Sequence, residues 1–332
     1  MLGVLYAALG AFTFALNNVT MRRGVVTGSV LQGMAVTVPI GGLSFLLMTV
    51  AFGELGQLVM FPTAALTWLA CKGVVHFVIG RYCNYKSNQL MGVNLTAPVV
   101  QLQVPFAMLL AVVILHEKFT VLQAIGSALM LSGSFITQGN AGKAKKKALA
   151  PGRKPKPTFQ PRVLSGYIFG LGAAMCYGSS PLMARQAFLH APGVSTAAGG
   201  CLAYTAATLF FSLILLKPGS WDNIKCTKRE NLPWFFSSAV LVAISQAFVY
   251  ASLAIAPLMV VTPILQLSLV FRLFLSQLIN RDYEVMNTAV IIGAVTAVLG
   301  SILVSFDTDE LTTLLGSPQS LADVLRHRLV GR

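Results

Sequence analysis

Acidic residues are scarce in this chain: only ten of its 332 residues are Asp or Glu, and all ten lie outside the long apolar runs. Paired catalytic carboxylates, carboxylate metal sites and proton relays inside a membrane all need acids in such positions. The five cysteines show neither CxxC nor zinc-ligand spacing, so most are expected to pack as small hydrophobic residues. No glycine-rich phosphate loop follows a strand. We therefore expect no enzyme, no metal and no cofactor.

Charge of either sign is also rare. Charged residues make up 10% of the chain, against about 25% in a typical soluble protein, while 55% is hydrophobic and mean hydropathy is +0.74. The chain is therefore expected to be an all-α, multipass protein integral to the membrane, with the bacterial inner membrane as its location. The ten predicted transmembrane helices are 2–20, 30–50, 63–82, 91–115, 119–138, 164–184, 194–216, 233–254, 258–279 and 286–306.

A basic, proline-rich stretch divides the chain in two. Residues 139–163 hold eight Lys or Arg and four prolines but no acid, which predicts a solvated, extended linker near anionic lipid headgroups rather than a nucleic-acid site. It separates a first five-helix unit, 1–138, from a second, 164–306. A charged tail, 307–332, follows, and its residues 320–330 are expected to form a short amphipathic surface helix.

The two units are similar in sequence. The residues that align, first unit named first, are Gly10 and Gly172, Arg23 and Arg185, Tyr85 and Tyr250, Ser87 and Ser252, Pro98 and Pro263, and Gln101 and Gln266. Because each unit holds an odd number of helices, the second must enter the membrane in the opposite direction. This predicts an inverted repeat, and transporters bind substrate between such repeats and expose it to each side in turn.

Each unit also ends in a proline-containing fourth helix, a short acidic turn and a glycine-spaced fifth helix. The first unit has Pro98, "HEKF" at 116–119, and Gly126 with Gly133; the second has Pro263, "RDYE" at 281–284, and Gly293 with Gly300. These features resemble the EamA-type repeats of the drug/metabolite transporter superfamily. The resemblance implies a ten-helix metabolite transporter with a central cavity. The four glycines are expected to serve close helix packing or contact with a second copy of the chain.

Two positions put basic side chains well inside predicted spans. Lys72 lies near the middle of the third span, and His76 follows four residues later on the same α-helical face, so both are expected to line the cavity. Arg272 lies about two turns from the end of the ninth span, where snorkelling or an ion pair with Asp282 competes with a cavity position. Arg81, at the end of the third span, is expected to be an interfacial anchor.

Uncharged polar residues complete the expected cavity. They are Thr13, Asn17, Asn94, Gln101, Gln246, Tyr250 and Gln266. The alternative is that such groups only hydrogen-bond helix to helix. Pro98 and Pro263 are expected to loosen the backbone near the middle of the membrane, where hinges are useful.

The expected function is export of an anionic or zwitterionic metabolite, such as an amino acid or organic acid, because the intramembrane charges are all basic. The alternatives are a lipid flippase and a non-transporting scaffold or regulatory subunit. Expected partners are the small-molecule substrate, the lipid bilayer and a second copy of the chain. Orientation stays open: 17 Lys and Arg follow odd-numbered spans and five lie on the other side, which places the linker in the cytoplasm, whereas the resemblance implies cytoplasmic termini.

Overall fold

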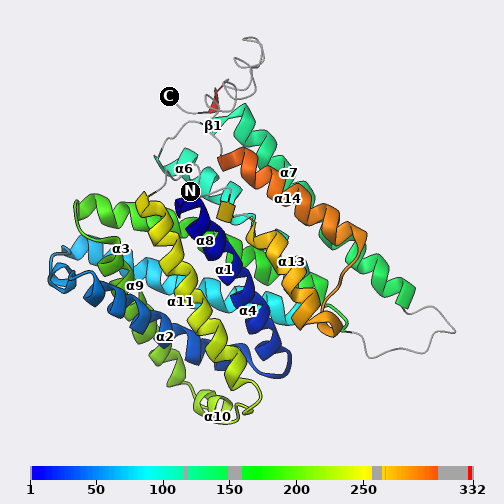
Figure 1. Ribbon diagram of the computed structural model, residues 1–332, viewed down its shortest axis with the longest axis horizontal. Coiled ribbons are helices and arrows are strands. Elements are labelled where there is room, and N and C mark those ends of the chain that lie inside the picture. The colour runs from blue at the N-terminus through cyan, green and yellow to red at the C-terminus, as the bar shows by residue number, and fades with distance from the viewer. Residues whose placement is uncertain are drawn as a thin grey trace.

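The computed structural model describes residues 2–115, 119–148, 159–255, 264–265, 267–305 and 328–330, and almost all of them are helical (Figure 1). The helices of the first unit are α1 Leu2–Thr27, α2 Val30–Ala51, η1 Leu55–Val59, α3 Thr63–Lys72, η2 Gly73–Gly80, α4 Arg81–Met91, α5 Val93–Val100, α6 Gln103–Leu115 and α7 Val121–Ala148. Those of the second are α8 Val163–His190, α9 Thr196–Leu215, α10 Ser220–Lys225, α11 Leu232–Ile255, α13 Ser268–Ile279, η3 Arg281–Tyr283 and α14 Thr288–Ser305.

Several of these helices are long and apolar enough to cross a bilayer. Six such stretches occur in the part of the chain that the structure describes, and three shorter apolar helices accompany them. The six are Leu2–Thr27, Val30–Ala51, Thr63–Met91, Val93–Ile114, Thr196–Leu215 and Leu232–Val249.

The third predicted span is longer than its hydropathy suggests. Instead of ending near residue 82, the helix continues without a break from α3 through η2, a π-helical stretch, to Met91 in α4. The sequence of α4, RYCNYKSNQLM, looks like a loop because it is polar. Its polar side chains nevertheless turn inward, since Asn84, Ser87 and Asn88 are all buried.

The fourth predicted span is broken in the middle. α5 ends at Val100, a turn covers Gln101 and Leu102, and α6 begins at Gln103. The break lies three residues after Pro98 and four before Pro105. Because proline has no N–H, Pro105 cannot donate to the Gln101 carbonyl, which accepts from the Val104 N–H at 3.0 Å instead.

Two terminal regions differ from their predicted form. α7 runs to Ala148, so residues 139–148 are helical although the whole linker, 139–163, was predicted to be extended. In the tail, residues 328–330 form strand β2 rather than part of a surface helix. β2 (Arg328–Val330) pairs antiparallel with β1 (Phe119–Thr120).

Helices of the two units pack against one another in exchanged pairs (Figure 1). α1 packs on α11, and α8 packs on the α3–η2–α4 helix. α1 also contacts α13, and α8 also contacts α5 and α6. α2 packs on α9, and α7 packs on α14. Each of these contacts therefore has a counterpart in which the two units change places.

In the α7–α14 contact, backbone meets backbone at glycines. A Cβ atom added at Gly126 would lie 2.7 Å from the Gly300 carbonyl oxygen, and one added at Gly300 would lie 2.5 Å from the Gly126 carbonyl oxygen. About two helical turns further along, Gly133 and Gly293 meet in the same reciprocal way, at 2.5 Å and 2.6 Å. All four glycines thus lie where two backbones touch, within one chain.

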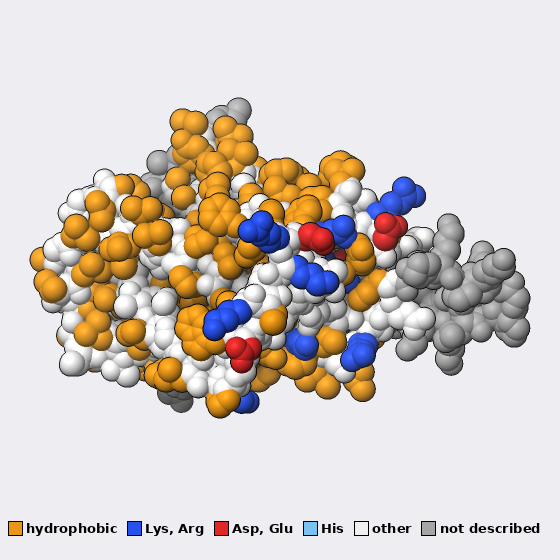
Figure 2. All heavy atoms as spheres, turned by 90° about the horizontal axis from the view of Figure 1, so that it is seen from below, with side chains coloured by type: hydrophobic (Ala, Val, Ile, Leu, Met, Phe, Trp, Pro, Cys, Tyr) orange, Lys and Arg blue, Asp and Glu red, His pale blue; other side chains and the backbone are white. Residues whose placement is uncertain are grey.

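Much of the outer surface is apolar. Leu47, Leu209, Leu213 and Phe236 are examples of large side chains that are more than half exposed. Figure 2 shows hydrophobic side chains over a large part of one end of the molecule, with the charged side chains gathered in a limited area of it. An apolar exterior of this extent suits hydrocarbon chains rather than water.

The glycine contact gives a direct stability test. We expect Gly300→Ala to lower the free energy of unfolding in detergent by about 1–3 kcal/mol, because the new methyl group overlaps backbone that cannot yield. Gly42→Ala is the matched control, since its nearest neighbour lies at 3.6 Å and alanine favours a helix. Thermal unfolding of the purified variants measures both; equal stability of the two would contradict the expectation.

Candidate functional site

A cavity of about 300 Å³ lies in the centre of the bundle. Both units build it: α1, η2, α4, α5 and α6 contribute from the first, and α8, α9, α11 and α13 from the second. Cavities between helices of a bundle, lined by apolar walls and a few polar groups, are common binding sites for small molecules.

Half of the predicted cavity residues line this space. They are Asn17, His76, Gln101, Gln246 and Arg272. Gln266, the hinge candidate Pro263 and the side chain of Tyr250 lie outside the described residues. Three others, Thr13, Lys72 and Asn94, are not among the lining residues.

Lys72 is not a lining residue, and the helix changes its geometry directly after it. The π-helical stretch begins at Gly73, and a π turn holds more residues than an α turn. His76 is among the residues that line the cavity, and Lys72 is not. Trp68 and Ile79, on the same continuous helix, are 36% and 45% exposed.

Thr13 and Asn94 bond within the protein instead. The Thr13 hydroxyl donates to the Leu9 carbonyl at 2.7 Å, one turn back on its own helix. Asn94 is fully buried; its Oδ1 accepts from the Ser276 hydroxyl at 2.6 Å, and its Nδ2 donates to the Val285 carbonyl at 3.3 Å. The helix-to-helix alternative therefore describes Asn94, whereas Thr13 bonds within its own helix.

Arg81 requires a correction, because it is not an interfacial anchor. It is 6% exposed and lines the cavity, since the helix that carries it continues ten residues beyond it to Met91. One terminal nitrogen donates to the Thr37 carbonyl at 3.0 Å and the other to the Tyr204 hydroxyl at 2.7 Å. Its guanidinium therefore lines the cavity, and its two terminal nitrogens donate hydrogen bonds to neutral oxygen atoms.

Aromatic rings surround this arginine, and the sequence pattern did not single them out. The Phe77 and Tyr204 rings stack with their centroids 3.7 Å apart, and the Arg81 guanidinium lies 5.5 Å from each. The His76 ring lies 4.6 Å from that of Tyr177. Such residues look like ordinary helix packing in a sequence, since only the three-dimensional contact brings them to one cavity.

Arg272 also lines the cavity, and its surroundings differ from those of Arg81. It is 6% exposed, so it does not snorkel, and its guanidinium lies 5.0 Å from the Phe14 ring centroid. Across the described ranges one ion pair occurs, and it does not involve Arg272, so the predicted pair with Asp282 is absent there. Its Nε atom is buried and has no hydrogen-bond partner.

The cavity wall is basic. Arg81, Arg272 and His76 line it, and no Asp or Glu is among the lining residues that the structure describes. Within those same described ranges no three His, Cys, Asp or Glu side chains are grouped as a metal site would require. The arrangement can therefore hold a negatively charged group by hydrogen bonds and charge.

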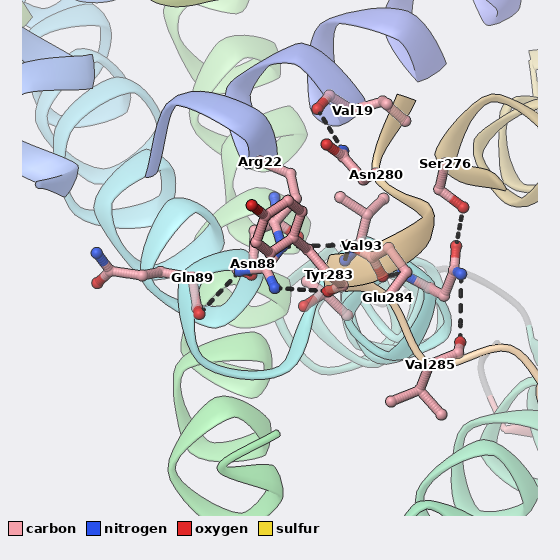
Figure 3. A network of polar contacts seen from close by, with 12 residues as sticks. Val19, Arg22, Asn88, Gln89, Val93, Ser276, Asn280, Tyr283, Glu284 and Val285 are labelled. Atoms are coloured by element: carbon pink, nitrogen blue, oxygen red, sulfur yellow. Dashed lines mark hydrogen bonds and ion pairs between the residues drawn. The ribbon is translucent and has the colours of Figure 1, made fainter. Parts of the chain in front are cut away.

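A buried ion pair lies beyond one end of the cavity (Figure 3). Arg22, on α1, donates from Nε to the Glu284 carboxylate at 3.2 Å, and both side chains are at most 1% exposed. Its terminal nitrogens donate to the Asn88 and Gln89 carbonyls at 2.7 Å and 2.9 Å and to the Tyr283 carbonyl at 2.8 Å. All three nitrogens of this arginine therefore donate hydrogen bonds.

Glu284 joins the same network to the start of α5. Its two oxygens accept from the N–H groups of Val93 and Asn94 at 2.9 Å and 3.1 Å, which places a negative charge at a helix N-terminus. Gly92 has φ +88°, and a Cβ there would lie 2.5 Å from the carboxylate, so only glycine fits. Burial raises the pKa of Glu284, whereas Arg22 and the two N–H groups oppose that rise.

The network links the two units on one side of the cavity. On α1, Arg22 lies five residues beyond Asn17, about 7.5 Å along the helix. Asn280, directly after α13, lies eight residues beyond Arg272 and donates to the Val19 carbonyl at 2.8 Å. Together these bonds connect α1, α4, α5 and the 280–285 turn, as Figure 3 shows.

Comparison with known proteins agrees with this architecture. The family model described as "EamA-like transporter family" matches residues 1–138 and 164–306, which is most of the chain. The chain belongs to the EamA-like transporter family. This confirms the resemblance seen in the sequence, and with the apolar helices it makes the chain an integral membrane transporter of small molecules. No curated protein matches it.

The EamA-like fold also resembles solved structures. One of them, a crystal structure described only as that of a protein, is 14% identical, with a TM-score of 0.51. The match covers 94% of this chain and 99% of the other. At this identity the likeness concerns the fold alone.

In this EamA-like protein the ion pair should stabilise the closed end of the cavity. We expect Glu284→Gln to lower the free energy of unfolding by about 3–5 kcal/mol, because it leaves the buried Arg22 guanidinium without its counter-charge. Asp282→Asn, an exposed acid two residues away, is the control and should be near neutral. Thermal unfolding in detergent compares them, and an unchanged Glu284→Gln protein would show that the pair carries no stability.

Proposed function

We propose that this chain exports an anionic or zwitterionic small metabolite across the bacterial inner membrane by alternating access between two inverted repeats. The observation that carries the proposal is the central cavity, which both units line and which has basic residues but no described acid in its wall. Family membership supports transport as such. The basic wall supports the sign of the substrate's charge, since buried cations attract anions.

The exchanged helix contacts support the inverted repeat. A two-fold axis in the membrane plane would turn the α1–α11 contact into the contact between α8 and the α3–η2–α4 helix, and both contacts occur. The sequence alignment places Gly126 on Gly293 and Gly133 on Gly300. The same axis would therefore exchange the Gly126–Gly300 contact with the Gly133–Gly293 contact, and both contacts occur between α7 and α14. Transporters built on such repeats move one unit against the other around a fixed site.

The Arg22–Glu284 network supports alternation as the mechanism. The bonds from Arg22 to Glu284 and Tyr283, and those from the Val93 and Asn94 N–H groups to Glu284, run between the first unit and the second. Release of substrate toward that side requires the units to separate there. Because the contact consists of hydrogen bonds to charged groups, separation can exchange them for bonds to water.

Transport itself is tested by flux. Purified protein in proteoliposomes should move at least one member of a panel of amino acids and organic acids, and Arg81→Gln should reduce that flux about 10- to 100-fold, because a buried cation and its ordered aromatic surround are lost. Lys72→Ala is the matched control and should retain near wild-type flux, since Lys72 is not among the lining residues. Absence of flux across the whole panel would instead favour the scaffold alternative, and movement of labelled lipid the flippase.

Alternation is tested by access to the cavity. In a protein without its native cysteines, Ser268→Cys places a thiol in the cavity wall, and an impermeant thiol reagent reports its exposure from each side. Adding Glu284→Gln should raise its reaction from the network side about tenfold, which corresponds to 1.4 kcal/mol lost from the closed state. No increase would mean that the network does not seal that side.

The network side can be identified in the same vesicles. Native Cys226 is exposed, and the segment around it lies at that end of the bundle, because Thr27 donates to Asn231 and Ser29 donates to Asn223. A protein with Cys226 as its single cysteine therefore marks the side. Asp282→Asn in the Ser268→Cys protein is the charge control and should leave the reaction rate unchanged.

A further inference from the structure

The cavity contains two arginines, and the described part of the protein holds them differently. The terminal nitrogens of Arg81 donate hydrogen bonds to the Thr37 carbonyl and the Tyr204 hydroxyl. The buried Nε of Arg272 has no hydrogen-bond partner, and its guanidinium lies 5.0 Å from the Phe14 ring centroid. Buried cations in proteins are normally paired and hydrogen-bonded, so a guanidinium with an unpartnered N–H in a cavity can bind an anion.

The planar shape of the guanidinium limits which anions can bind to it well. A guanidinium presents its N–H groups in a planar fork that matches the two oxygens of a carboxylate. The neighbouring walls are aromatic and aliphatic, with Phe14, Phe77, Tyr177 and Val249 among the lining residues. The cavity therefore fits a carboxylate at Arg272 and an apolar body beside it, within about 300 Å³.

The rest of the cavity wall disfavours a substrate that carries a positive group beside its carboxylate. An α-amino acid carries an ammonium two bonds from its carboxylate, so binding at Arg272 would bring the ammonium close to that guanidinium. No Asp or Glu lines the described part of the cavity to balance it, and Arg81 adds another positive charge. Asn17 Oδ1, an oxygen that could accept from an ammonium, already accepts a hydrogen bond from the Ser238 hydroxyl at 2.6 Å.

We infer that the substrate is a small monocarboxylate without an ammonium group, such as a 2-hydroxy or 2-oxo acid, held through its carboxylate by Arg272. This inference rests on the proposed transport function and narrows it, since the proposal itself admits both organic acids and amino acids. A hydroxyl or keto oxygen at the second carbon would meet the amide side chains of Gln101 and Gln246, which line the same cavity.

The experiment compares compounds that share a carbon skeleton. Flux into proteoliposomes is measured for 2-hydroxy-4-methylpentanoate against leucine, and for phenyllactate against phenylalanine. We expect each hydroxy acid to move at least tenfold faster than its amino acid. Equal or faster flux of the amino acids overturns the inference while leaving the transport proposal intact.

Variants of Arg272 test its role directly. Arg272→Gln should reduce hydroxy-acid flux at least tenfold and remove the preference over the amino acid, while Arg272→Lys, which keeps the charge but not the planar fork, should retain part of both. Lys217→Gln, at an exposed position, is the charge control. Hydroxy-acid flux that is unchanged in a folded Arg272→Gln protein overturns the inference.

Binding separates failure of this inference from failure of transport. Equilibrium binding of the same four compounds to purified protein in detergent is measured beside the flux. Tighter binding of the hydroxy acids without any flux would support the inference and contradict the transport proposal. Tighter binding of the amino acids would overturn the inference whatever the flux.

Discussion

A charged side chain in an apolar bundle must be neutralised or hydrogen-bonded, and the fold of this chain is arranged around that constraint. Arg22 meets it fully, with one carboxylate and three carbonyl oxygens. Arg81 meets it with neutral oxygens and aromatic faces. Arg272 lies beside an aromatic face, and its buried Nε has no hydrogen-bond partner. The three arginines thus range from a fully paired structural group to the one that we infer holds the substrate.

The fully satisfied arginine also organises the backbone around it. Glu284, its counter-ion, accepts the first N–H groups of α5, and that close approach requires a glycine with positive φ at position 92. A single carboxylate therefore fixes the start of one helix, the end of another and the turn from the second unit that lies between them. Removing it disturbs three elements at once, which is why its effect exceeds that of a surface acid.

The length and composition of the apolar runs were enough to predict an integral, helical membrane protein, and the paired prolines and glycines were enough to predict the family. Features set by three-dimensional contact were not predictable. Polar residues of α4 looked like a loop because inward-facing polar groups and solvent-facing ones have the same letters. The π-helical stretch after Lys72 was not predictable either, since the periodicity argument assumes an α-helical turn throughout the span. Arg22 and Glu284 are 262 residues apart, and no local pattern connects them.

Two kinds of contact join the units, and they suit different tasks. α7 and α14 touch backbone to backbone through glycines, where any sliding brings larger neighbours into overlap, so this contact resists change. The Arg22–Glu284 network is polar, and its groups can exchange protein partners for water when it opens. If one unit rocks against the other, the glycine contact is therefore the place where they stay together. The ion pair is the place where they part, and the cavity with Arg272 lies beside it.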